Sequence, residues 1–106
     1  MLLHTLKPGH LGMKTPPKMI DGAVVLAWAI ADAGNSFGIS TVVLPEGREI
    51  KGLVIATYHN DPGYYVFACD GDWSVVGDTC HETLSAAKAF PPSLYDVDIV
   101  TWTDCT

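Results

Sequence analysis

Large apolar residues alternate with small or polar ones over several short stretches of the chain. Along residues 23–31 the large residues fall on even positions, and the odd positions are mostly alanine. A period of two residues is typical of a strand, so we predict a strand here, with a helix as the alternative because alanine favours helices. Two more apolar runs predict strands over 39–45 and, after a tight turn at 46–48, over 49–59.

Two turn sequences predict how the next strands connect. Asp-Pro-Gly at 61–63 combines the fixed negative φ of proline with the positive φ that glycine permits, which suits a type II turn. Gly-Asp at 71–72 suits a two-residue hairpin loop between YYVFACD and WSVVGD. We therefore expect residues 48–78 to form a three-stranded antiparallel meander.

One short helix should follow the meander. Thr79 and Glu82 have the spacing of a capping box, in which each side chain bonds the backbone of the other residue, and the sequence ETLSAAKAF continues as a helix. The pair Pro91-Pro92 should stop this helix, because proline lacks the N–H that a helix interior needs. VDIVTWT, at 97–103, predicts a final strand.

These elements predict an α+β fold, with a curved, mainly antiparallel sheet of five or six strands and one short helix packed on one face. Residues 1–20 are rich in proline and glycine and show no helical or strand period, so we expect an irregular N-terminal arm. Residues 21–106 form a single α+β domain, since a chain of 106 residues holds one core.

Both faces of the predicted sheet are apolar. Pairing across Pro62-Gly63 sets Tyr58 against Phe67, which then lies against Val76. One face carries Val54, Ala56, Tyr58, Phe67, Cys69 and Val76, and the other carries Leu53, Ile55, Thr57, Val66, Ala68, Trp73 and Val75. A single helix covers one face only, so the N-terminal arm, closure of the sheet into a barrel, or a second copy of the chain must cover the other. We favour self-association into a homodimer.

Charge and composition exclude several classes of protein. The net charge of −6 and the scattered lysines and arginines argue against nucleic-acid binding, which needs a positive field. The longest apolar run has nine residues, whereas a membrane span needs about 20. Three cysteines cannot all pair within one chain, and the first residues lack a signal peptide, so we expect a reduced, cytoplasmic protein.

Residues 69–84 hold the densest group of side chains capable of chemistry. Close pairs such as C-x-x-C and H-x-x-x-H are absent, and the spacing does not fit a calcium loop, so we predict no metal and no cofactor. Asp78, Cys80 and His81 could form an acid/base pair beside a nucleophile. Turn formation and helix capping account for the same residues, and we favour that interpretation and predict no catalytic residue.

Aromatic residues and histidines mark a second candidate region, around the predicted turn at 61–63. Such side chains at a hairpin tip can line a ligand pocket or anchor a partner, although cross-strand packing is the commoner role. A small-molecule binder or minor enzyme would use a pocket near Tyr58, His59, Trp73 and His81. The candidate contact residues are Tyr58, His59, Tyr64, Tyr65, Trp73 and His81.

The run CDGDWSVVGDTCHETLSAAK, at 69–88, resembles a C-terminal pattern of small uncharacterised bacterial proteins, including those of mobile gene cassettes (integron cassettes) and toxin-immunity-like families. The resemblance rests on Asp70, Asp72, Trp73, Asp78, Thr79, His81, Ala87 and Lys88. It implies a small α+β protein of mostly unknown activity and assigns no catalytic residue.

These features favour a non-enzymatic binding or accessory protein of unknown partner, of the mobile-cassette or immunity-like kind. The acidic charge, the two apolar faces and the missing catalytic constellation all favour it. Its partner would be a protein, and the alternative remains the small-molecule binder or minor enzyme described above.

Overall fold

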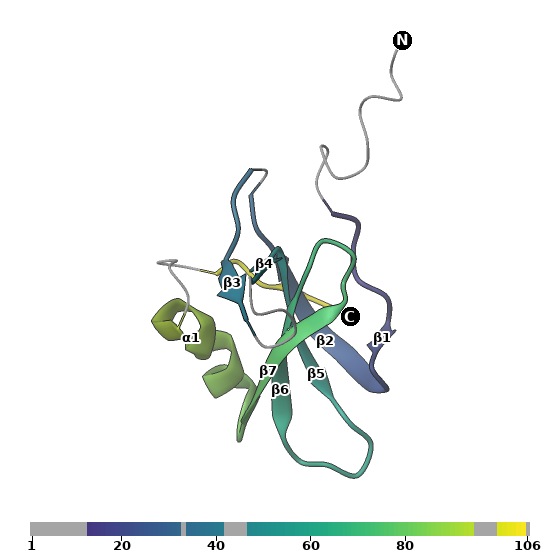
Figure 1. Cartoon of the computed structure of the whole chain (residues 1–106). Helices are drawn as coiled ribbons and strands as arrows, with labels where there is room; N and C mark the ends of the chain where they lie inside the picture. The colour runs from purple at the N-terminus through teal and green to yellow at the C-terminus, as the bar shows by residue number, and fades with distance from the viewer. Residues whose placement is uncertain (1–12, 33, 42–46, 95–99, 106) are drawn as a thin grey trace.

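A computed structural model describes residues 13–32, 34–41, 47–94 and 100–105. Its main sheet is antiparallel, in the order β1-β2-β5-β6-β7, and β8 also pairs with β2 (Figure 1). These strands are β1 (Met19–Ile20), β2 (Ala23–Ile30), β5 (Gly52–Thr57), β6 (Tyr64–Cys69), β7 (Val75–His81) and β8 (Thr103–Asp104). A separate ribbon pairs β3 (Gly38–Ser40) with β4 (Arg48–Ile50), and the helix is α1 (Leu84–Leu94).

The prediction of a curved antiparallel sheet with one helix is confirmed. The sheet bends into a half-barrel, and Ala87 of α1 is buried against one of its faces. The helix is a minor part of a fold that is mostly sheet. None of the helices in the described part of the chain is long and apolar enough to cross a membrane.

Buried side chains form one cluster on each face of the sheet. The helix-side cluster contains Ala27, Ala29, Phe37, Ile50, Leu53, Ile55, Val66, Ala68, Val76 and Ala87. The second cluster contains Ile20, Ala23, Val25, Val54, Ala56, Phe67, Cys69 and Trp73. The prediction that both faces are apolar is therefore confirmed, and each face must be shielded separately.

Strand β2 confirms the strand predicted over 23–31. Its alanines are more deeply buried than the large residues that alternate with them. Ala27 and Ala29 lie in the helix-side cluster, whereas Val24 is 48% exposed. A bulge between Val25 and Ala27 makes Leu26 the extra residue of the strand. Val25 and Trp28 therefore contact the same second cluster despite their odd spacing.

The turn between β1 and β2 is a two-residue hairpin turn that places the end of the N-terminal arm in the sheet. Asp21 and Gly22 have φ values of 50° and 83°, and Ile20 pairs with Ala23. Positive φ at both central residues is the signature of a type I′ turn, for which Asp-Gly is a preferred sequence.

The β5–β6 connection is longer than the predicted type II turn. Val54 pairs with Phe67 and Ala56 with Tyr65, so the prediction that Tyr58 pairs with Phe67 is wrong. Asn60, with φ 67°, is the residue with positive φ, and Gly63 is not. Because the register moved by an even number of residues, the predicted faces of β5 and β6 are nevertheless correct.

The β6–β7 connection also differs from the predicted two-residue loop. Trp73 has φ 63°, Cys69 pairs with Val75, and a bulge shifts the next pair to Ala68 with Gly77. Val76 therefore lies in the helix-side cluster, while Trp73 and Val75 contact the second cluster. The faces that we predicted for Trp73, Val75 and Val76 are wrong, because an odd shift moves side chains to the opposite face.

The capping-box prediction at Thr79 is also wrong, because β7 continues through His81 and keeps Thr79 in the sheet. The helix is capped by Thr83, whose Oγ1 accepts a hydrogen bond from Ala86 N at 3.0 Å.

The two prolines do not stop the helix, which contains both and ends at Leu94. Pro92 cannot donate to the carbonyl of Lys88, four residues earlier. That carbonyl instead accepts a hydrogen bond from Trp102 Nε1 at 3.1 Å. The indole thus replaces the hydrogen bond that the proline removes.

Three predicted strands have different bounds in the structure. The strand expected over 39–45 is β3, and residues 42–46 lie outside the described part of the chain. The strand expected over 49–59 is divided at Lys51 into β4 and β5. The final strand is reduced to Thr103–Asp104, and residues 95–99 are not described.

Residues 13–20 cover part of the second face. Ile20 belongs to the second cluster, Met13 contacts it, and Trp73 Nε1 donates a hydrogen bond to the carbonyl of Lys14 at 2.9 Å. Of the three ways in which we expected this face to be covered, the N-terminal arm is the one that these contacts show. The homodimer stays a prediction.

Candidate functional site

Tyr58 and Tyr65 are the two predicted contact residues that lie side by side. Their rings meet edge to face with centroids 5.2 Å apart, and each also approaches Phe67 at 6.4 Å. All three contact the second cluster, so the pair lies on the face away from the helix. This arrangement is the cross-strand aromatic packing that the sequence allowed as the commoner role.

Asp61 holds the neighbouring loop in shape. Its carboxylate accepts hydrogen bonds from Gly63 N at 2.8 Å and from the Tyr65 hydroxyl at 2.7 Å. Both hydrogen bonds lower the pKa of Asp61, and the bond from Gly63 N has the larger effect. The hydrogen bond to the Asp61 carboxylate in turn raises the pKa of Tyr65 above its ordinary value. His59, in the same loop, is exposed.

Tyr64 and His81 lie on the opposite face. They are direct partners in the β6–β7 ladder, and Tyr64 contacts the helix-side cluster. His81 Nε2 lies 2.8 Å from Thr79 Oγ1, and its ring lies 4.6 Å from that of Phe90 on the helix. The Thr79 hydroxyl and the Phe90 ring both restrain the imidazole of His81, which remains partly exposed.

Trp73 lies at the other end of the sheet. Its ring packs on Gly52, the first residue of β5, whereas Tyr58 follows the last residue of that strand. The four residues of the small-molecule alternative therefore occupy separate places: Tyr58 and Trp73 at opposite ends, His81 on the opposite face, and His59 in a loop. The structure does not bring them together.

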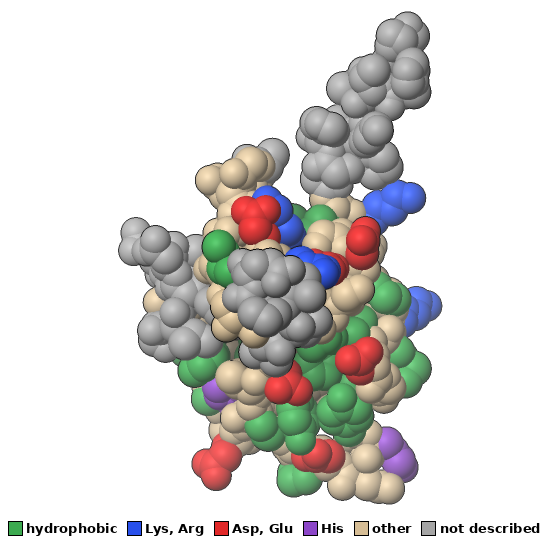
Figure 2. All heavy atoms as spheres, viewed as in Figure 1, with side chains coloured by type: hydrophobic (Ala, Val, Ile, Leu, Met, Phe, Trp, Pro, Cys, Tyr) green, Lys and Arg blue, Asp and Glu red, His purple; other side chains and the backbone are tan. Residues whose placement is uncertain are grey.

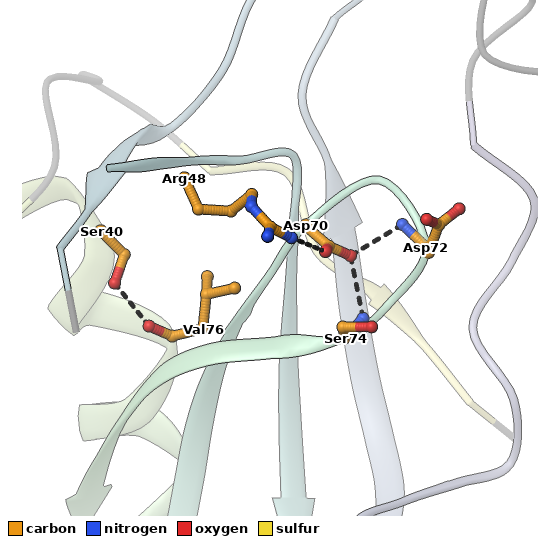
Figure 3. A network of polar contacts seen from close by, with 6 residues as sticks. All are labelled: Ser40, Arg48, Asp70, Asp72, Ser74 and Val76. Atoms are coloured by element: carbon orange, nitrogen blue, oxygen red, sulfur yellow. Dashed lines mark hydrogen bonds and ion pairs between the residues drawn. The ribbon is translucent and has the colours of Figure 1, made fainter. Parts of the chain in front are cut away.

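Asp70 anchors a polar network at the Trp73 end of the sheet (Figure 3). The Arg48 guanidinium, 40% exposed in its side chain, donates a hydrogen bond to Asp70 Oδ2 at 2.7 Å. The other carboxylate oxygen, Oδ1, accepts from the backbone N–H groups of Asp72 at 2.9 Å and Ser74 at 3.0 Å. The carboxylate thereby fixes the turn that carries Trp73, so its role here is structural.

A second contact of this network joins the β3–β4 ribbon to the main sheet. The Ser40 hydroxyl of β3 donates a hydrogen bond to the carbonyl of Val76 in β7 (Figure 3). Arg48, in β4, provides the other connection. Neither contact has a signal in the sequence, because the partners are far apart along the chain.

The cysteines form no bond to one another in the structure. Cys69 is buried, and burial, with smaller contributions from Asp70 and Asp21, raises the pKa of its thiol to about 12. Cys80 and Cys105 are exposed. Within the described ranges, no group of three or more histidine, cysteine, aspartate or glutamate side chains could hold a metal ion.

An incompletely covered row of side chains crosses the sheet on its helix side, at the end away from Trp73. Met19 pairs with Val24, Val24 with Thr57, and Tyr64 with His81. The register of Ala56 with Tyr65 places Thr57 beside Tyr64 and completes the row. We call Met19, Val24, Thr57, Tyr64 and His81 the sheet-end row.

The sheet-end row is the most exposed apolar part of the main sheet. Met19 and Val24 are 55% and 48% exposed, and the other three members are partly exposed. Leu84, which begins the helix just beyond β7, is 36% exposed. In Figure 2, hydrophobic side chains gather over the lower half of the molecule, where these strands end.

Three acidic residues lie at this end of the sheet, together with the exposed Lys18, which directly precedes Met19. Asp21 lies in the β1–β2 turn, Asp61 in the β5–β6 loop, and Glu82 directly after β7. The antiparallel pairing brings these three positions to the end that carries the sheet-end row. Figure 2 shows acidic side chains among the hydrophobic ones there.

Comparisons of the chain with protein-family models, curated proteins and solved structures found no match.

Sequence reasoning found Tyr64 and His81 but not the rest of the sheet-end row. The sequence predicts an irregular arm around Met19, and it places Val24 on the large-residue side of a strand whose partner it does not identify. The Asp-Gly pair at 21–22 was the signal that could have placed both residues, because a type I′ hairpin sets Met19 opposite Val24.

Proposed function

We propose that this chain is a non-enzymatic binding protein, of the accessory or immunity-like kind, that contacts a partner protein through the sheet-end row. The observation that carries the proposal is the exposure of Met19 and Val24, which are adjacent across two strands. Contiguous exposed apolar patches mark protein interaction sites, and these two side chains are contiguous across the β1–β2 ladder. The sheet-end row lies on the helix side of the sheet, whereas Met13 and Ile20 cover the second cluster on the other face.

The chemistry of the dense stretch supports a role in binding. Asp70 is used to form a turn, Thr79 lies in a strand and contacts His81, and Cys69 is buried with a raised pKa. A nucleophile needs a depressed pKa or an adjacent base. Cys80, the nucleophile considered from the sequence, pairs with Tyr65 on the second face, whereas His81 pairs with Tyr64 on the helix side, so the histidine does not lie beside the thiol. The small-molecule alternative has less support, because its four residues lie apart.

We also place this function in the cytoplasm. All three thiols are free in the structure, and the two exposed ones would be prone to oxidation in an oxidising compartment.

A capture experiment with matched variants tests the proposal. The wild-type protein, the double variant Met19→Thr/Val24→Thr and the control Ile39→Thr are immobilised and exposed to a lysate of the source cells at low and moderate salt. Threonine preserves strand propensity while removing apolar surface. Ile39, in β3, is 67% exposed and lies outside the sheet-end row.

The proposal predicts a protein that the wild type and Ile39→Thr retain and that the double variant loses. Retention of the same proteins by all three forms, or of none by the wild type at either salt concentration, would contradict it.

A further inference from the structure

We infer that residues 13–17 form a strap that opens from the sheet as one unit while the sheet stays folded. The hydrogen bond from Trp73 Nε1 to the carbonyl of Lys14 holds it closed, and opening uncovers the face around Cys69. Figure 1 shows the strap beside the β6–β7 connection, which carries Trp73. The strap lies on the face opposite the sheet-end row, so this inference is independent of the proposed function.

The strap is attached to the sheet by few contacts. Three of its five side chains are exposed, and Met13 and Pro16 are only partly buried. Between described residues, one hydrogen bond joins the strap to the sheet, and it is the bond that the Lys14 carbonyl accepts from Trp73 at 2.9 Å. A segment with little buried surface and few hydrogen bonds opens at a lower free energy than the core does.

The neighbouring strands prevent the strap from joining the sheet. The ladder between β1 and β2 ends where Val25 N donates to the carbonyl of Lys18 at 3.0 Å. β8 occupies the next part of the same edge, where Cys105 N donates to the carbonyl of Leu26 at 2.8 Å. The prolines at 16–17 also have no N–H to donate to a strand. The strap therefore cannot extend β1 and must be held by side-chain contacts.

Two consecutive prolines make the strap move as one piece. A proline ring fixes its own φ at about −65° and restricts the residue before it, so residues 15–17 favour an extended conformation. Lys18 is not followed by a proline, and its carbonyl is bonded to Val25. The hinge is therefore the backbone between Pro17 and Lys18, and β1 stays in the sheet when the strap opens.

Opening uncovers a deeply buried part of the second cluster. A Cβ atom on Gly52 would lie 2.5 Å from the Trp73 indole, so the ring fills the space above this glycine. Gly52 pairs with Cys69, and directly paired residues point to the same face of a sheet. The ring therefore lies beside Cys69, which is fully buried. Without the Lys14 carbonyl, the indole loses its hydrogen-bond acceptor and is free to rotate away from Cys69.

Hydrogen exchange of the full chain, followed by NMR at increasing urea concentrations, tests the inference. Opening of the strap exposes little surface, so the exchange rate of Trp73 Nε1–H should hardly change with urea at low concentrations. The ladder amides of β5 and β6 should exchange at least about tenfold more slowly, because they require the sheet to open. Their exchange rates should rise steeply with urea.

A proline-to-glycine variant tests whether the strap controls this exchange. Pro16→Gly/Pro17→Gly should speed exchange of Trp73 Nε1–H at least about fourfold, because the open strap gains chain entropy. The matched control is Pro62→Gly, which loosens the β5–β6 loop at the other end of the sheet. We expect this control to leave the exchange rate of Trp73 Nε1–H unchanged.

Labelling of Cys69 by iodoacetamide gives a second measurement. This thiol should be labelled through the open state, far more slowly than the exposed cysteines. Trp73→Phe keeps an aromatic ring but removes the hydrogen bond to the strap, so labelling should become about fivefold faster. Trp102→Phe is the matched control, because it removes an indole hydrogen bond to Lys88 on the helix side and should leave the labelling rate unchanged. Circular dichroism and the unfolding midpoint confirm that each variant is folded.

Three results would overturn the inference. The first is exchange of Trp73 Nε1–H with the same steep urea dependence as the β5 ladder amides, which would mean that the strap opens only when the sheet unfolds. The others are an unchanged exchange rate in Pro16→Gly/Pro17→Gly and equal labelling rates in the two tryptophan variants. None of these measurements depends on the sheet-end row, so their failure leaves the proposed function to its own test.

Discussion

Gly52→Ala should destabilise the protein by displacing Trp73. A Cβ atom at residue 52 would lie 2.5 Å from Cζ3, 2.8 Å from Cη2 and 3.1 Å from Cε3 of the indole. The ring cannot easily move away, because its Nε1 is bonded to the carbonyl of Lys14 and its backbone has φ 63° in a turn fixed by Asp70. The substitution therefore affects both the core and the attachment of residues 13–18.

The size of the effect follows from opposing contributions. Overpacking of a core costs about 1–3 kcal/mol, and loss of the indole hydrogen bond adds about 1 kcal/mol. Replacing glycine by alanine within a strand returns about 0.5–1 kcal/mol. We expect a net loss of about 1–3 kcal/mol, which lowers Tm by roughly 5–20 °C in a domain of this size.

Urea unfolding followed by tryptophan fluorescence measures this loss, and limited trypsin cleavage at Lys14 and Lys18 reports on the release of the segment. Gly71→Ala is the matched control, because a Cβ at Gly71 meets no atom within 4 Å. We expect this control to be neutral or slightly stabilising and to leave the cleavage rate unchanged.

Equal stability of Gly52→Ala and the wild type would refute the reasoning, as would equal changes in the two glycine variants. A double-mutant cycle with Trp73→Ala gives a second test. Once the indole is removed, Gly52→Ala should cost little, so the two changes should be strongly non-additive.

Three further results are expected. The Cys69 thiol, whose pKa is raised to about 12, should resist a thiol reagent at neutral pH while the other two cysteines react, and mass spectrometry of native and unfolded protein would count them. Thr83→Ala should cost about 1 kcal/mol and reduce helix content, whereas Thr79→Ala should leave the circular dichroism of the helix unchanged. Because the pKa of Asp61 is lowered in the folded protein, its contribution to stability is present above the ordinary pKa of 3.8 and is lost as the pH falls through the folded pKa. Tyr65→Phe removes one of the hydrogen bonds to Asp61 and should raise its pKa in an NMR titration. An unchanged pKa would disprove the hydrogen bond.

The sequence was sufficient to predict β2, β5 and β6 and an antiparallel sheet, but not β1, the division of β4 from β5, or the residues that close the turns. The apolar runs of β5 and β6 are long and rich in β-branched and aromatic residues, so their existence and their faces followed from local pattern. The turn after β6 depends on Asp70 accepting two backbone N–H groups, with a tryptophan at positive φ. No propensity favours that conformation for tryptophan, which is held by its packing on Gly52 and its hydrogen bond to the carbonyl of Lys14.

The candidate site was predictable only in part, for a related reason. A bulge between Val25 and Ala27, and another in β7 between the partners of Cys69 and Ala68, each move side chains to the opposite face, and neither has a local sequence signal that fixes its position. The aromatic pair of Tyr58 and Tyr65 was found because it lies beside a recognisable turn. Val24 became a candidate only when its neighbours across the sheet were known.

The pairing of β2 also determines when the sheet can be completed during folding. β1–β2, β5–β6 and β6–β7 are local hairpins that each need only a short loop, whereas Ala27 pairs with Asp104 near the other end of the sequence. Contacts between distant residues require a large loss of chain entropy before they form, so they slow folding. In a chain synthesised from its N-terminus, one edge of β2 therefore remains open until almost all of these residues have left the ribosome, and chaperones would have that interval in which to bind it.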